Sequence, residues 1–213
     1  MAKVLIVVFL AIVSAVGFGI QTQKAFVGVR ITNQQIKSQV RLVQKTLVHL
    51  DQRFLASLAP IDALHLTFNF YNVSQNNLDP ARKALTISAE SYVWHFGGLS
   101  LDFQGISTAE NGTRLVFGLT PESSTKIEAF YGITTEAFRG QGFESLNRDF
   151  HPQITIAALQ PSESPVLKSK MRRLVNSEFY FGKQMVQRLD LCSEVIDRGT
   201  GYFGILAEAE FPL

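Results

Sequence analysis

The feature that most restricts the fold is an Asn-Gly pair, Asn111-Gly112, in the middle of the segment LSLDFQGISTAENGTRLVFGLT, residues 99–120. Asn-Gly suits a tight turn between antiparallel strands, because both residues tolerate the positive φ angles that the turn requires. The segment is therefore expected to form a β-hairpin. An antiparallel hairpin among irregularly interleaved strands and helices favours an α+β fold over a doubly wound parallel sheet.

Further strands and helices are expected on both sides of this hairpin. The sequence predicts strands over residues 25–32, 64–73, 151–159, 185–195 and 201–211. It predicts helices after the cap Asn33 to near Pro60, from Asp79-Pro80 to about Trp94, from Thr120-Pro121 to Gly140, and in a basic stretch near residues 168–173. We expect these elements to form one domain, residues 21–213, because no linker or low-complexity segment interrupts them.

The composition limits the partners and the crosslinks of this domain. The chain has 213 residues, of which 46% are hydrophobic, and a net charge of +2. It therefore lacks the strongly basic surface of a general nucleic-acid-binding protein. Cys192 is its single cysteine, so an intramolecular disulfide is excluded.

The first 20 residues read as a secretory signal peptide. Lys3 is followed by an uncharged apolar run, Val4 to Ile20, with small residues near its end. An uncleaved membrane anchor is the main alternative, and a buried helix the second, because the run approaches the roughly 17 residues that span a bilayer. We expect a secreted or membrane-anchored protein of the secretory pathway. Asn72-Val73-Ser74 and Asn111-Gly112-Thr113 would then be glycosylation acceptors.

Two strands that are far apart in the sequence carry the same pattern of polar and apolar residues. In ALHLTFNF, alternation places His65, Thr67 and Asn69 on one face and Leu64, Leu66, Phe68 and Phe70 on the other. In HPQITIAAL, it places His151, Gln153, Thr155 and Ala157 opposite Ile154, Ile156 and Ala158. Each strand thus presents a polar-x-Thr pair backed by apolar residues.

This doubled pattern resembles the 2H phosphoesterase superfamily, whose members carry two His-x-Thr/Ser motifs on strands facing a cleft. The segments AFVGVRITNQQI, LHLTF, LDFQGIST, FHPQITIAAL and QRLDLCSEV are similar, in order, to the phosphoesterase-like central domain of the A-kinase anchoring proteins. The resemblance extends over residues 25–211. It implies a bilobal α+β fold, with two antiparallel sheets facing a central cleft and helices packed outside.

The resemblance also implies a chemistry and a ligand. One histidine takes a proton, the other gives one, and the two hydroxyls hold the phosphate oxygens without a metal or cofactor. Family substrates are 2′,5′-linked or 2′,3′-cyclic phosphodiesters, which suggests a nucleotide or short oligonucleotide as partner of a monomeric domain. Kinase anchoring is not implied, because the kinase-binding helix of those proteins lies outside this domain.

The chain departs from the family pattern at one motif position. His65 and Thr67 match the first motif and Thr155 matches the second hydroxyl, but Gln153 stands where the second histidine is expected. Glutamine forms hydrogen bonds but exchanges no proton near neutral pH, so we expect catalysis to be impaired. His151 is a candidate substitute on the same strand face, roughly 6–7 Å away along the strand.

Other interpretations of these residues stay open. His65 is alternatively a hydrogen-bonded strand histidine, and Gln153 a solvated edge residue. Two other functions also stay open: an active 2H-type phosphodiesterase that uses His65 with His151 or water, and an interaction scaffold without a ligand. Lys168, Lys170, Arg172 and Arg173 favour a solvated helix face, with contact to ligand phosphates as the alternative. No role is assigned to His49 or His95.

Overall fold

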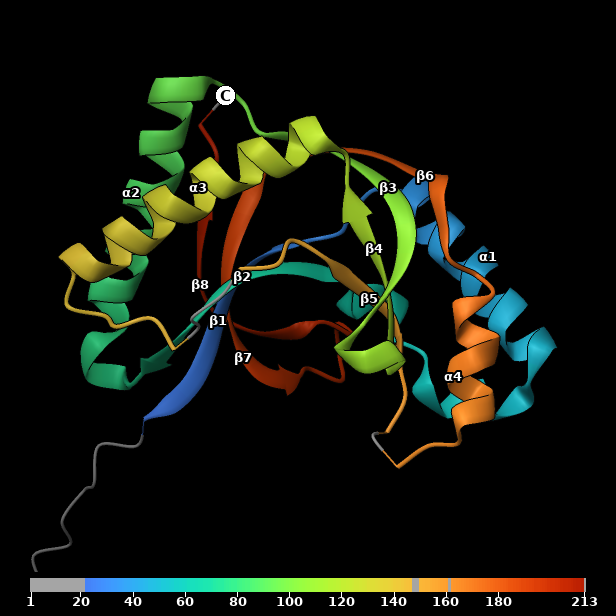
Figure 1. Cartoon of the computed structure of the whole chain (residues 1–213). Coiled ribbons are helices and arrows are strands. Elements are labelled where there is room, and N and C mark those ends of the chain that lie inside the picture. The colour runs from blue at the N-terminus through green and yellow to red at the C-terminus, as the bar shows by residue number, and fades with distance from the viewer. Residues whose placement is uncertain (1–21, 147–149, 161, 213) are drawn as a thin grey trace, which may run out of the picture.

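Two antiparallel sheets form the frame of the protein in a computed structural model, which describes residues 22–146, 150–160 and 162–212 (Figure 1). The first sheet has the strand order β2-β1-β7-β8 and the second has the order β5-β4-β3-β6. The first comprises β1 (Gln23–Arg30), β2 (His65–Val73), β7 (Arg188–Ile196) and β8 (Phe203–Glu210). The second comprises β3 (Ser100–Ala109), β4 (Arg114–Leu119), β5 (Ile154–Ala158) and β6 (Asn176–Met185). The predicted α+β class with two antiparallel sheets is confirmed.

Helices cover the outer sides of the two sheets. Helix α2 (Leu78–Phe96) packs against β7 and β8, and α3 (Pro121–Gly140) packs against α2. Helix α1 (Gln34–Leu50) packs against β5 and β6 of the second sheet, beside α4 (Pro165–Arg172). Figure 1 shows the two helix pairs at opposite sides of the molecule. The two helix pairs therefore pack on different sheets, α2 with α3 on the first and α1 with α4 on the second.

The helix ends follow from local capping. The Asn33 side chain accepts hydrogen bonds from the backbone nitrogens of Gln35 and Ile36, at 2.7 and 3.3 Å, and so begins α1 as predicted. Thr120 caps α3 in the same way, with Pro121 in the first turn. Helix α1 ends at Leu50 and not near Pro60, because Asp51 caps a separate 3-10 turn, Gln52–Ser57, that holds buried Phe54.

The predicted hairpin is present, with a longer turn than a two-residue loop. Strands β3 and β4 pair from Ala109↔Arg114 to Phe103↔Leu119, and the turn Glu110–Gly112 joins them. All three turn residues have positive φ angles of 49°, 56° and 81°. We call residues 110–112 the hairpin turn.

Strand β6 was missing from the sequence prediction, which placed two strands after the basic helix instead of three. Its first half is largely exposed, and its pairing with β3 shifts register twice. Gly182, at a φ of 133°, also interrupts the alternation. A strand with these irregularities lacks the period of two by which strands are recognised.

Both motif strands contain a bulge directly after their threonine. In the ladder of β1 with β2, Gly28 pairs with Thr67 and Val27 with Asn69, so Phe68 is the extra residue. In the ladder of β4 with β5, the extra residue is Ile156, between paired Thr155 and Ala157. A bulge shifts the alternation of the residues beyond it to the other face.

Because of these bulges, the sequence prediction of which residues share a face is wrong for part of both motif strands. Asn69 and Ala157 are fully buried, instead of lying on the polar face with the motif residues. Phe70 is only half-buried, packs against Phe26 and lines the cleft described below, instead of facing away from His65. The predicted alternation therefore holds up to each threonine and fails after it.

An aromatic core connects the first sheet to α2 and α3. Phe68 meets the Phe130 ring edge-on at 5.1 Å, and Phe130 meets Tyr92 at 5.2 Å. Burying one such ring contributes about 1.5–3 kcal/mol to the free energy of unfolding. Within the described residues, no helix has the length and apolarity needed to cross a membrane. The predicted leader, residues 1–20, lies outside the described residues.

Candidate functional site

His65 is the first residue of β2, and a backbone contact determines which ring nitrogen carries its proton. Its Nδ1 lies 2.8 Å from the carbonyl oxygen of Ala63. A carbonyl oxygen only accepts, so Nδ1 donates, and the neutral ring has its lone pair on Nε2. This is the form that a general base or a hydrogen-bond acceptor requires.

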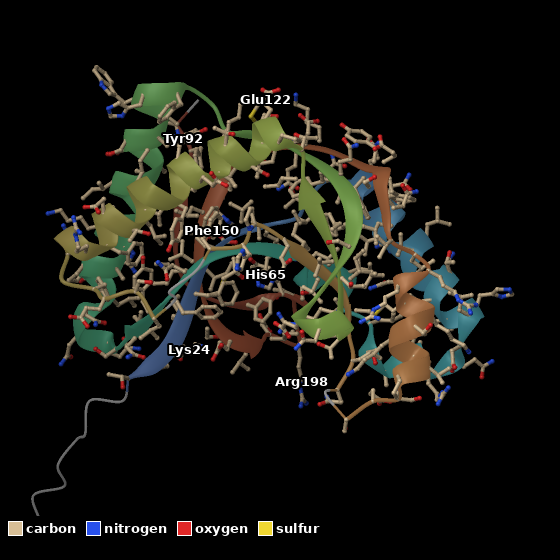
Figure 2. The ribbon with its side chains drawn as sticks, in the orientation of Figure 1. Lys24, His65, Tyr92, Glu122, Phe150 and Arg198 are labelled. Carbon is tan, nitrogen blue, oxygen red and sulfur yellow. The ribbon has the colours of Figure 1, made fainter. Side chains whose placement is uncertain are left out.

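Two aromatic rings enclose the imidazole of His65. Phe26 lies with its ring centroid 4.7 Å away, and Phe203 meets the imidazole edge-on at 4.8 Å. Burial among these groups lowers the pKa of His65, and the hydrogen bond to Ala63 only partly offsets the effect. The ring is therefore kept neutral at physiological pH, in a fixed orientation (Figure 2 labels it at the centre of the molecule).

The two motif strands meet between the sheets. Strands β2 and β5 each lie at one edge of their own sheet, and they lie next to each other. A cleft of about 670 Å³ opens there. It is lined by all five residues that the sequence analysis selected, namely His65, Thr67, His151, Gln153 and Thr155.

The polar groups of the motifs differ in what they offer a ligand. Within the described part of the chain, no hydrogen bond engages the Thr67 hydroxyl, the Thr155 hydroxyl or the Gln153 amide, so all three are available. These groups donate and accept hydrogen bonds, but none of them exchanges a proton near neutral pH. His151 is exposed and lines the same cleft, so an imidazole is present beside Gln153. The site thus combines one oriented neutral histidine with hydrogen-bonding groups suited to phosphate oxygens.

An ion pair that the sequence analysis missed also lines the cleft. Arg114, the first residue of β4, lies 3.0 Å from a carboxylate oxygen of Glu110 in the hairpin turn. Among the lining residues that the structure describes, Arg114 is the one with a permanent positive charge. The pairing of β4 with β5 places Arg114 beside the second motif, and no local sequence pattern marked it.

A buried amide on α1 supports the second motif from behind. The Nε2 group of Gln44 donates to the carbonyl oxygens of Ala59, at 2.8 Å, and Ile156, at 3.1 Å. The same Ile156 oxygen accepts from the backbone nitrogen of Ala59 at 3.0 Å. These bonds fix the bulge that follows Thr155.

The basic helical stretch lies outside the cleft, as the solvated-face interpretation predicts. Lys170 pairs with Asp51 at 3.0 Å, and none of Lys168, Lys170, Arg172 and Arg173 lines the cleft. A larger hollow of about 920 Å³, at the ends of β1, β7 and β8, contains none of the motif residues. We therefore assign the site to the smaller cleft. His49 and His95 are exposed and lie outside it.

Within residues 22–146, 150–160 and 162–212, no group of three or more His, Cys, Asp or Glu side chains is arranged to hold a metal ion.

Cys192 is buried, and this burial raises the pKa of its thiol to about 12. The thiol therefore stays protonated, and it lies on the side of β7 that packs against Phe26 and Tyr202.

Comparisons with solved structures agree with this architecture. E. coli LigT complexed with 3′-AMP has a TM-score of 0.60 and 19% identity, over 91% of this chain and 100% of that chain. E. coli LigT in apo form has a TM-score of 0.61 and 16% identity, over 89% of this chain and 97% of that chain. The MHV ns2 PDE domain has a TM-score of 0.56 and 14% identity, over 80% and 99% of the two chains. At these identities the likeness establishes the fold.

Sequence comparison identifies the family. Human A-kinase anchor protein 7 isoform gamma is 22% identical over 191 residues, which are 84% of this chain and 54% of that protein. The chain thus spans about half the length of that relative. Residues 25–211 match the family described as the AKAP7 2′5′ RNA ligase-like domain. The chain belongs to this family, within the 2H phosphoesterase superfamily.

Proposed function

We propose that the cleft binds a nucleotide or a short 2′,5′-linked oligonucleotide, with a phosphate between Thr67 and Thr155 and with hydrolysis impaired by Gln153. One observation carries the proposal: both polar-x-Thr motifs line a single cleft of about 670 Å³. That volume lies in the range of small-molecule sites, roughly 300–1,000 Å³. The solved structures of E. coli LigT with 3′-AMP, NADP+ and ATP support nucleotides as the ligand class.

In this proposal, some of the cleft residues bind the phosphate and His65 transfers the proton. The Thr67 and Thr155 hydroxyls and the Gln153 amide hold non-bridging phosphate oxygens. Nε2 of His65 accepts the proton of an attacking hydroxyl or water, because Nδ1 is already committed to Ala63. The leaving oxygen then needs a proton donor, and Gln153 supplies none. The domain acts in this proposal as a monomeric binding protein with residual hydrolysis at most.

One observation favours an active phosphodiesterase as the second candidate. His151 lines the same cleft as Gln153, two residues away on the approach to β5. Pro152 favours an extended backbone at His151. In that case His151 protonates the leaving oxygen of a ligand that is displaced toward it. Substantial wild-type turnover that is lost in His151→Ala supports this candidate over the impaired one.

Ligand-induced thermal stabilisation tests the binding proposal. A nucleotide at 100 times its dissociation constant adds about 2.7 kcal/mol to the free energy of unfolding, which a melting curve detects. AMP and a 2′,5′-linked diadenylate should each raise the melting temperature of the wild type. The double variant Thr67→Ala/Thr155→Ala should remove the shift. Thr125→Ala, which removes an exposed hydroxyl on α3, is the matched control and should retain it.

Two results would overturn the proposal. A melting temperature that responds to neither nucleotide in the wild type supports the scaffold interpretation instead. A shift that survives the double threonine substitution assigns the ligand to another part of the protein, for example the larger hollow lined by Arg30 and Arg188.

A further inference from the structure

The ion pair between Glu110 and Arg114 places a negative group beside Arg114, the one permanent cation among the described residues that line the cleft. The Nη1 atom of Arg114 lies 3.0 Å from Oε1 of Glu110, and both side chains remain about half exposed, at 43% and 57%. An exposed pair of this kind contributes little to stability, because water and salt screen it. Stability therefore does not explain why this ion pair lies at the cleft, and we consider a role in ligand binding.

The hairpin turn holds the two charges in place. Glu110 and Asn111 have φ angles of 49° and 56°, a conformation that non-glycine residues rarely adopt. The Thr113 hydroxyl donates to the Glu110 carbonyl oxygen at 2.8 Å and closes the turn. On the other side, the Arg172 guanidinium packs so closely that a Cβ added at Gly112 would lie 3.0 Å from its Nη2. The turn is thus a preformed element of the cleft wall.

Strand pairing defines how far Arg114 lies from the second motif. Val116 is the partner of Thr155, and Arg114 lies two residues before Val116 on the same face of β4. Two residues of a strand extend about 6.6 Å. This length is the backbone offset of Arg114 along β4 from the Val116–Thr155 pair. An offset of this size is longer than a diphosphate link and comparable to one sugar between two phosphates.

The carboxylate of Glu110 shows that an anionic group can bind the Arg114 guanidinium in the cleft. Guanidinium groups bind carboxylates and phosphates through the same parallel hydrogen bonds. A phosphate that binds Arg114 can therefore take the place of the Glu110 carboxylate. A phosphate carries more negative charge than a carboxylate and more acceptor oxygens, so it competes effectively for the guanidinium.

We propose that Arg114 selects ligands with a second phosphate, one sugar away from the phosphate held by Thr67 and Thr155, and that Glu110 occupies this second position until the ligand displaces it. The inference rests on the proposed function. It assigns the ligand class more narrowly, as nucleotides with phosphates on two different hydroxyls of one sugar, or oligonucleotides with a terminal phosphate. Nucleotides with a single phosphate leave the ion pair intact and bind more weakly.

Calorimetric titration with two probes tests this selectivity. The probes are AMP and adenosine 3′,5′-bisphosphate, each titrated into the wild type, Arg114→Gln, Arg114→Lys and Glu110→Gln. The wild type should bind the bisphosphate at least tenfold more tightly than AMP. Arg114→Gln should reduce this preference to near one, and Arg114→Lys should retain part of it, because lysine keeps the charge but loses the planar fork.

The Glu110→Gln variant tests the displacement directly. Removal of the competing carboxylate should raise the affinity for the bisphosphate about threefold or more. The matched control is Arg82→Gln, which breaks an exposed ion pair with Asp79, 2.7 Å long, on α2. It should leave both affinities as in the wild type. A melting curve of each variant confirms that it is folded.

The outcomes separate this inference from the proposed function. If AMP binds but the wild type shows no preference for the bisphosphate, or if Arg114→Gln weakens both probes equally, the selectivity is wrong and the binding site stands. If the control Arg82→Gln lowers the preference as much as Arg114→Gln does, general electrostatics explains it and the inference is wrong. If neither probe binds the wild type, the proposed function fails and the inference fails with it.

Discussion

The side-chain amide of Gln44 on α1 donates a 3.1 Å hydrogen bond to the carbonyl oxygen of Ile156, the bulged residue that follows Thr155. Gln44 is 6% exposed, so its polar atoms are shielded from water that would otherwise replace the bond. The bond connects a helix on the outer side of the second sheet to the strand that carries the second motif. The geometry of Thr155 in the cleft therefore depends on a residue that does not line the cleft.

Replacement of Gln44 should lower stability and ligand affinity together. Gln44→Met keeps the length of the side chain but removes both donated bonds, to Ala59 and Ile156. Loss of a partner for a buried polar group costs about 1–3 kcal/mol. Urea denaturation should show this loss, and titration with AMP should show weaker binding. Gln34→Met, at an exposed position of the same helix, should change neither, and equal effects of the two variants would contradict the assignment.

Restoration of the missing imidazole should raise the rate of hydrolysis. Gln153→His rebuilds the second His-x-Thr motif on the strand face that lines the cleft. A general acid or base contributes about 10²–10⁴ in rate, so a 2′,5′-linked dinucleotide should be hydrolysed at least about 10²-fold faster than by the wild type. Initial rates followed by chromatography measure this.

Two controls accompany the Gln153→His variant. His65→Ala in the same background should remove the gain, because the reaction needs one group that takes a proton and another that gives one. His151→Ala should have little effect if Gln153 alone accounts for the defect. Wild-type turnover equal to that of Gln153→His would show that the second motif is not impaired.

The buried His65 should make stability depend on pH in a known direction. Burial lowers the pKa of His65 in the folded protein below its unfolded value of about 6.5. At a pH between these two pKa values, His65 is mostly protonated in the unfolded chain and mostly neutral in the folded protein. The free energy of unfolding therefore falls as the pH falls through this range. His65→Asn, which retains a donor for Ala63, should lack this contribution.

The comparison between the two proteins is essential, since other groups also make stability depend on pH. Burial raises the pKa of Asp190, which stabilises the folded state as the pH falls and so opposes the effect of His65. The difference between wild type and His65→Asn cancels this contribution. If that difference is the same at pH 7 and pH 5 in urea denaturation, His65 is not buried as a neutral ring.

Passage through the secretory pathway should leave a glycan on the chain. We propose this route from the apolar run Val4 to Ile20, and both acceptor asparagines, Asn72 and Asn111, are exposed in the folded protein. Expression of the full chain in eukaryotic cells should give a product whose mass falls on glycosidase treatment. Asn72→Asp with Asn111→Asp should abolish the change. Unmodified cytosolic protein that retains Met1 would contradict the proposal.

The sequence predicted which motif residues line the cleft better than it predicted the strand faces beyond them. His65, Thr67, Gln153 and Thr155 could be selected because strand alternation over a few residues is a local property, and all of them line the cleft. Asn69 and Phe70 were assigned to the wrong faces, because a bulge depends on pairing with β1 and leaves no mark in β2 alone.

The roles of Gln44 and Arg114 could not be predicted from the sequence for a similar reason. Gln44 is one of several glutamines on an amphipathic helix, and only the packing of α1 on β5 brings it to Ile156. Arg114 gains its role from the neighbouring strand, which no local pattern encodes. Contacts between elements that are distant in the chain decide such roles, whereas caps such as Asn33 and Thr120 follow from adjacent residues and were predicted correctly.

The two bulges have a consequence for solubility. An edge strand with free backbone groups is a template on which another chain can add a strand and begin to aggregate. The cleft requires β2 and β5 to be edge strands, yet a bulge interrupts the regular row of donors and acceptors on each. Neighbouring segments also cover the exposed edges, through bonds from Leu146 to Phe70, at 2.9 Å, and from Ala59 to Ile156, at 3.0 Å. The protein can thus place two edge strands beside a ligand cleft while their backbone groups stay unavailable to a strand of a second polypeptide.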